Sequence, residues 1–111
     1  MDPHDALIAA PEHHRLAYED ERVRVLETRI PPGETTALHT HRWPGTLYIL
    51  SFGHFVRRDE HGAVLLDTRE SGISAETGDA FWSDPLGLHT LENVDSVPIH
   101  IMAPEIKTLG D

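Results

Sequence analysis

Short segments of alternating polar and apolar residues, separated by turn-forming residues, run through most of this sequence. "RLAYEDERVRVLETRI" alternates on both sides of the acidic turn at 19–21, and "FVRRDEHGAVLLDTRE" does so around the turn at 59–62. Side chains two residues apart share one face of a strand, so each segment predicts a β-hairpin. Helical periodicity is almost absent. The pattern therefore predicts an all-β fold, either a sandwich or a closed barrel.

The remaining segments complete this prediction. Residues 46–52 are apolar at nearly every position, which predicts a central strand buried on both faces. Near the start, Asp2 and Pro3 are typical of a helix N-cap and first helical position, and Pro11 ends the short helix that they predict. We expect residues 1–20 to form an N-terminal segment with this helix and the first strand. Residues 21–111 are then expected to form a single barrel domain.

Composition narrows the function classes. The chain has no cysteine, which excludes disulfides and thiolate metal sites, so any metal would be held by nitrogen and oxygen. Its net charge of −10, spread along the chain, argues against nucleic acid or an anionic membrane as a partner. No long apolar run predicts a membrane span, and we expect a cytoplasmic protein. Nine histidines are many for this length, and imidazole suits proton transfer and first-row metals.

His39 and His41 are separated by one residue in "ALHTHRW". On a strand they share a face, with Cβ atoms roughly 6–7 Å apart, so both imidazoles can bind one metal ion. Taken alone, such a pair is also compatible with two solvated or merely hydrogen-bonded side chains. The pair by itself does not decide between a metal site and an ordinary surface.

Two longer stretches around these histidines resemble the two sequence motifs of the cupin superfamily. "GETTALHTHRWPGTLYILSFG" matches the first motif at both terminal glycines and at His39 and His41, while Thr46 stands where the family has a glutamate. "GDAFWSDPLGLHTLENV" matches the second motif in its glycines, its proline, His89 and Asn93, with small shifts in spacing.

The resemblance implies a small single-domain, RmlC-like jelly-roll barrel and a homodimer formed through edge strands. It also implies His39, His41 and His89 as ligands of a divalent transition metal such as Fe, Ni, Mn or Zn. Because Thr46 is a poor ligand, the usual fourth protein ligand would be missing. Three neutral imidazoles favour an anionic molecule in the open coordination positions.

No other residue clearly fills the place of the missing glutamate. His54 lies too far along the chain from Thr46, Glu92 should face away from His89, and Glu34 has no predicted direction. His100 is expected to be a hydrogen-bonded core or interface residue. The remaining histidines, in the N-terminal tail or in a turn, are expected to be solvated: His4, His13, His14 and His61.

Aromatic residues close to the motifs are candidates for the lining of a ligand pocket. Trp43, Tyr48 and Phe81 are the main aromatic candidates and Thr46 is a further one, although a plain core or rim position explains the aromatic residues as well. If they line the mouth, the pocket would be apolar around a cationic centre, which suits a small organic acid or a diketone-like chelator.

Three functions follow from these features. The first is a metal-dependent enzyme of the dioxygenase type acting on a small organic substrate, since some cupin dioxygenases that resemble this pattern also use three histidines. The second is a non-catalytic cupin that binds a small ligand. The third is a dimeric scaffold whose metal site has decayed, and the sequence alone leaves all three open.

Overall fold

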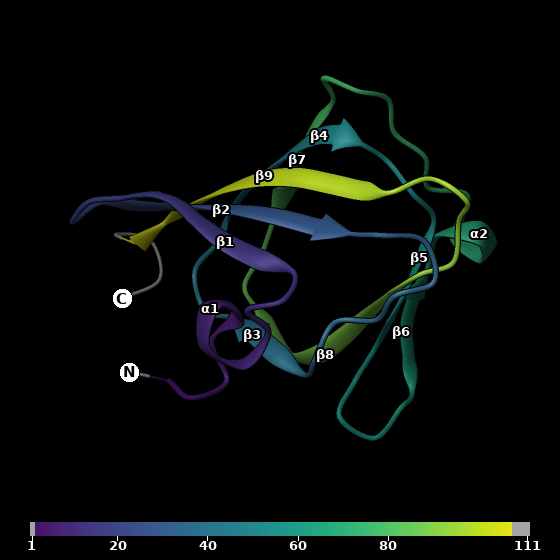
Figure 1. Ribbon diagram of the computed structural model, residues 1–111, viewed down its shortest axis with the longest axis horizontal. Coiled ribbons are helices and arrows are strands. Elements are labelled where there is room, and N and C mark those ends of the chain that lie inside the picture. Colours follow the sequence, from purple (N-terminus) through teal and green to yellow (C-terminus); the bar gives the residue numbers. More distant parts are fainter. Residues whose placement is uncertain (1, 108–111) are drawn as a thin grey trace.

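Two antiparallel sheets face each other and form a barrel (Figure 1). The computed structural model describes residues 2–107. The first sheet contains, in spatial order, β1 (His14–Glu19), β2 (Val23–Ile30), β9 (Ile99–Ile106), β4 (Gly45–Ser51) and β7 (Ala80–Ser83). The second contains β3 (His39–His41), β8 (Leu86–Asn93), β5 (Phe55–Arg58) and β6 (Val64–Asp67). This arrangement confirms the predicted all-β jelly-roll barrel.

Both predicted hairpins are present, and an aspartate organises each turn. Asp20 accepts hydrogen bonds from the backbone N–H groups of Arg22 and Val23 between β1 and β2. Asp59 does the same for the N–H groups of His61 and Ala63 between β5 and β6. Such side-chain bonds stabilise a tight turn because they satisfy backbone donors that no strand partner reaches.

The strand β4 departs from its prediction. It lies between β9 and β7, so it is central as expected. Its outer face is not covered, however, as the 43% exposure of Tyr48 shows. Ile49, the next residue, is buried against the interior. An antiparallel sheet can pack one face on the core and expose the other to solvent, where single aromatic rings are tolerated. The sequence alone does not reveal that, among residues 2–107, no second layer covers this outer face.

The helix α1 (Ala6–Ala9) confirms the predicted N-terminal helical segment, but its N-cap is Asp5 and not Asp2. The Asp5 carboxylate accepts a hydrogen bond from the N–H of Leu7. The helix lies beside β1 and β3, the edge strands of the two sheets (Figure 1). It therefore closes the seam between the sheets at the place where the first histidine motif lies.

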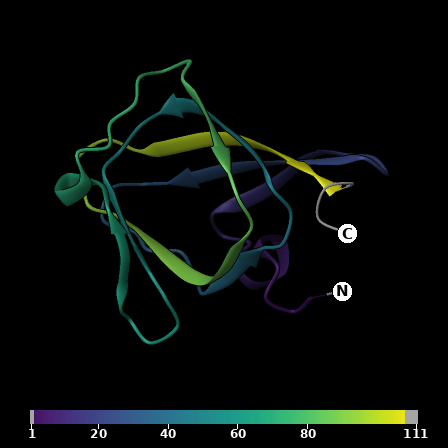
Figure 2. The same ribbon diagram turned by 180° about the vertical axis from the view of Figure 1, so that it is seen from behind.

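A second short helix, α2 (Thr68–Ser71), was not predicted; its N-cap is Asp67, and it ends at Gly72, which has a φ of +74°. Seen from behind, the chain crosses from α2 back to the first sheet through a long loop before β7 (Figure 2).

Neither helix in the described part of the chain has the length and apolar character needed to cross a bilayer. The division at residue 20 stays a prediction, and β1 pairs with β2 across it.

Asn93, from the second motif, has a structural role. Its amide Nδ2 donates hydrogen bonds to the carbonyls of Ile30 and Val97, and its Oδ1 accepts one from the N–H of Asp95. Gly53 lies so close to Asn93 and Ile99 that a Cβ atom would crowd them. Asn93 therefore joins the ends of strands from both sheets, and the missing side chain of Gly53 allows their close approach.

Candidate metal centre

Four histidine rings meet where β1 and β3 approach each other. His14 begins β1, His39 and His41 lie on β3, and His89 on β8 pairs directly with His39 across the sheet. The ring of His39 lies 4.6 Å from that of His14, 5.0 Å from that of His41 and 4.3 Å from that of His89, measured between centroids. The His41 ring is 5.4 Å from that of His14 and 5.6 Å from that of His89.

Each of the four rings presents its Nδ1 atom to an oxygen acceptor. The distances are 3.0 Å from His14 to the carbonyl of Ala10, 2.7 Å from His39 to that of Ala37, and 2.7 Å from His89 to that of Gly87. The Nδ1 of His41 lies 3.0 Å from the Glu105 carboxylate. Because these oxygens accept hydrogen bonds and do not donate them, each Nδ1 carries the proton, and the lone pair of each neutral ring is on Nε2. Metal-binding histidines are oriented in this way.

Three of these histidines form the tightest group. Each of His14, His39 and His41 offers one ring nitrogen, and these three nitrogen atoms lie within 4.8 Å of one another. An ion that binds each nitrogen at about 2.0–2.1 Å spans donors up to about 4.2 Å apart, so the spacing of the three nitrogens is close to that of a metal site. These three histidines can therefore hold a metal ion. Among residues 2–107, this group contains no carboxylate.

The sequence prediction and the structure overlap in part. His39 and His41 belong to the group, and His89 lies against the ring of His39, so barrel closure brings the three motif histidines together. Whether His89 binds metal stays a prediction. Thr46 lines the adjacent cavity and is not part of the histidine group.

The expectation that His13 and His14 are solvated was wrong. The exposed fraction of His14 is 6%, because β1 begins inside the seam between the sheets and its first side chain packs on His39. His13 is also buried, and its Nε2 lies 2.8 Å from the carboxylate of Glu34. Neither residue belongs to a recognisable motif. Strand periodicity does not mark His14 for burial either, because the other residues of β1 are exposed.

Other histidines lie elsewhere, with partners of their own. His100 contacts the Glu27 carboxylate at 2.6 Å, which agrees with the hydrogen-bonded role expected for it. His54 contacts the hydroxyl of Thr68 at 2.9 Å. Glu92 forms an ion pair with Arg58.

A chain of buried charges supports the site from behind. Arg24 donates hydrogen bonds to both Asp5 and Glu105, and Glu105 in turn accepts one from His41. Burial alone would raise the pKa of Asp5, but the hydrogen bonds and charge of Arg24 hold it below its usual value. The network therefore connects the N-cap of α1 through β2 and β9 to a histidine of the candidate site.

Burial keeps three of the site histidines neutral. It lowers the pKa of His14 to about 3, that of His39 to about 4 and that of His89 to about 3. The positive charge that a neighbouring histidine would carry lowers these values further. Since a metal ion binds the unprotonated ring nitrogen, these three rings can bind metal well below neutral pH.

We expect the metal-free protein to lose stability on mild acidification. Unfolded histidine takes up a proton near pH 6.5, whereas the three folded rings do so near pH 3 to 4. Between these values the unfolded chain binds more protons. The free energy of unfolding therefore falls as the pH drops, by about 1 kcal/mol for each histidine from about pH 6.5 to about pH 5.5.

Urea unfolding in the presence of a chelator, repeated across this range, measures the dependence. His14→Gln should make the dependence shallower, while His61→Gln, in an exposed turn, should leave it as in the wild type. A free energy of unfolding that does not change between these pH values would contradict the expectation.

A cavity of about 440 Å³ opens beside the histidines, and all four contribute to its lining. Most of the other lining side chains are apolar or aromatic. Of the predicted pocket residues, Trp43, Thr46 and Phe81 line it. Tyr48 does not, because it points from β4 to the outer face while Leu47 and Ile49 face inward.

The two facing antiparallel sheets form a small double-stranded β-helix barrel, the fold found in cupins. Solved structures share this fold. A cupin domain from Bordetella pertussis Tohama I is 22% identical in sequence, with a TM-score of 0.67 over 85% of this chain and 91% of its own. An RmlC-like cupin family protein from Methanocaldococcus jannaschii is 15% identical, with a TM-score of 0.60 over 88% and 84%.

The polyketide cyclase RemF from Streptomyces resistomycificus is also similar. It is 17% identical, with a TM-score of 0.56 over 88% of this chain and 67% of its own. No protein-family model matches the sequence, and the search of curated proteins found no match. At these identities the likeness establishes the fold, and the function must be argued from the site.

Proposed function

We propose that this protein binds a divalent transition metal through His14, His39 and His41, with His89 as a fourth imidazole ligand. The observation that carries the proposal is the hydrogen-bonding pattern that the four rings share. Each Nδ1 is bound to an oxygen, which leaves each Nε2 available within one cluster beside the cavity. Imidazole nitrogen suits iron, nickel and zinc, and a site of neutral ligands keeps the positive charge of the ion.

The residues around the cluster divide the remaining tasks. The Glu105 carboxylate accepts a hydrogen bond from His41 and thereby orients this ring. It would place a negative charge behind the ligand that holds the metal. The apolar lining of the cavity excludes water from the side on which a ligand would approach. A bound metal would supply Lewis acidity and open coordination positions for a small organic molecule.

We infer that the protein is an enzyme of the dioxygenase type, acting on a small organic substrate in this cavity. A second candidate is a metal-dependent reaction without oxygen. The additional imidazole of His14 and the aromatic lining favour it, and the similar fold of RemF, a polyketide cyclase, agrees with it. Homodimer formation and a cytoplasmic location are further parts of the proposal.

Metal reconstitution tests the proposal directly. The protein is stripped with a chelator, then loaded with Fe(II), Mn(II), Ni(II) or Zn(II), and the bound metal is quantified by mass spectrometry. We expect one ion per chain for at least one metal, and oxygen consumption by the iron form with a diketone, thiol or aromatic acid. Failure to retain any of the four metals would refute the metal site. Retention without turnover of any compound would favour the non-catalytic ligand-binding alternative.

A further inference from the structure

Arg57 on β5 brings a positive charge into the cavity. The residue pairs with Leu91 of β8, and both line the cavity. His89 lies two residues before Leu91 and therefore on the same face of β8. Arg57 is thus a diagonal cross-strand neighbour of His89, at the spacing at which long side chains interact.

Within the part of the chain that the structure describes, no counter-ion accompanies this charge. The Nε atom of Arg57 is buried without a hydrogen-bond partner, and within residues 2–107 no carboxylate forms an ion pair with the guanidinium. Burial lowers the pKa of Arg57, and no neighbouring charge offsets this effect. The guanidinium carbon does lie 5.6 Å from the centre of the Phe55 ring. A cation–π contact satisfies none of its N–H donors.

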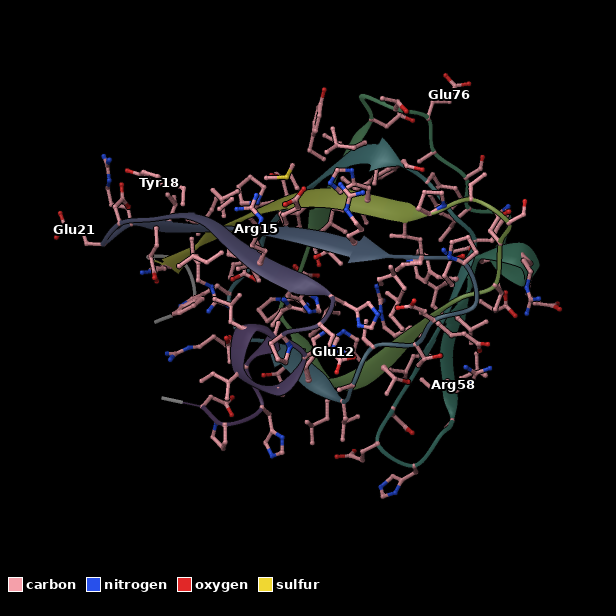
Figure 3. The ribbon with its side chains drawn as sticks, in the orientation of Figure 1. Glu12, Arg15, Tyr18, Glu21, Arg58 and Glu76 are labelled. Carbon is pink, nitrogen blue, oxygen red and sulfur yellow. The ribbon has the colours of Figure 1, made fainter. Side chains whose placement is uncertain are left out.

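The acidic residues of the lining are already engaged elsewhere. Glu105 binds Arg24 and His41, and Asp84 accepts a hydrogen bond from the indole N–H of Trp82 at the exposed rim. The adjacent Arg58, in contrast, has its own carboxylate partner in Glu92 and projects away from the barrel (Figure 3). Arg58 therefore has a carboxylate partner within the protein, whereas the neighbouring Arg57 has none among the described residues.

Arg57 is half-buried, and its Nε, which is shielded from water, has no hydrogen-bond partner. A partly desolvated guanidinium without an anion is costly. The cost is recovered when a ligand supplies the anion, and the planar fork of arginine matches a carboxylate with two parallel hydrogen bonds. The cavity is otherwise lined mainly by apolar and aromatic groups, which suit the carbon skeleton of such a ligand.

We propose that Arg57 binds the carboxylate of a small organic acid in the cavity. The acid's remaining part then lies toward His89 and the histidine cluster. That this part meets a metal ion rests on the proposed function, but the contact between Arg57 and the carboxylate does not. The ligand class is therefore a carboxylic acid with an apolar or aromatic body.

Calorimetric titration of the metal-free protein tests this assignment. Benzoate and phenylacetate serve as probes, and benzamide and phenylacetamide are their neutral counterparts of nearly equal shape. We expect the wild type to bind at least one acid more than about 10-fold more tightly than its amide, the range for hydrogen bonds to charged groups. Arg57→Gln should bring the two affinities to within about 3-fold of each other, and Arg57→Lys, which keeps the charge without the fork, should lie between.

Arg58→Gln is the matched control, because it removes a neighbouring arginine that does not line the cavity. It should retain the wild-type preference for the acids. Urea midpoints confirm that each variant is folded. The assignment is overturned if the wild type prefers neither acid over its amide, if folded Arg57→Gln keeps the preference, or if Arg58→Gln loses it equally.

Metal content separates this result from the proposed function. Arg57→Gln should retain metal as the wild type does, since Arg57 contacts none of the histidine ring nitrogens through a hydrogen bond. An acid preference in a protein that holds no metal would refute the metal site and leave the role of Arg57 intact. Metal binding without an acid preference would refute the role of Arg57 and leave the metal site intact.

Discussion

Replacing His39 with alanine is expected to lower the affinity for a divalent metal by more than about 100-fold. Loss of a residue that merely orients a metal ligand costs 10- to 100-fold, so loss of a ligand at the centre of the cluster must cost more. His39 is that centre, because its ring is adjacent to those of His14, His41 and His89. Competition against a metal-binding dye measures the affinity, and circular dichroism confirms the fold.

His61→Ala is the control, since its side chain is 82% exposed in the turn between β5 and β6. It should bind metal as the wild type does. His14→Ala adds a sharper comparison, because the sequence motifs do not include this residue whereas the geometry does. We expect it to weaken binding to a similar extent as His41→Ala. Wild-type affinity in both His39→Ala and His14→Ala would exclude a metal site at this cluster.

The difference between His14 and the motif histidines shows what sequence alone can predict. His39 and His41 share a face because of the two-residue period of a strand, and this is a local property. The hairpin turns at Asp20 and Asp59 are equally local, because the side chain bonds to backbone within a few residues. Such features were predicted with their approximate boundaries.

Other parts of the site depend on barrel closure, which no local pattern specifies. His14 becomes buried because the start of β1 meets β3 across the seam, although the two strands belong to different sheets. Asp5 caps α1 in place of Asp2, and its carboxylate also binds Arg24, which lies on β2. The exposure of Tyr48 depends likewise on what covers the outer face of the sheet. Each of these outcomes is decided by contacts between segments far apart in the sequence.

Arg24→Met is expected to destabilise the protein by about 3–5 kcal/mol, the usual cost of removing one partner from a buried ion pair. Arg24 is 5% exposed and binds two carboxylates, Asp5 and Glu105, which are themselves buried. Methionine fills much of the same volume but leaves both carboxylates without a counter-ion. Urea unfolding at neutral pH measures the loss as a lower midpoint at an unchanged slope.

Arg15→Met provides the comparison, because Arg15 also pairs with a glutamate, Glu27, but its side chain is 65% exposed. Exposed pairs contribute about 0–1 kcal/mol, so this variant should remain close to the wild type. Equal small losses in the two variants would contradict a stabilising role for the buried network. Because Asp5 caps α1 and Glu105 orients His41, we also expect Arg24→Met to weaken metal binding while Arg15→Met does not. A single buried guanidinium would then support both the closure of the barrel seam and the geometry of the histidines within it.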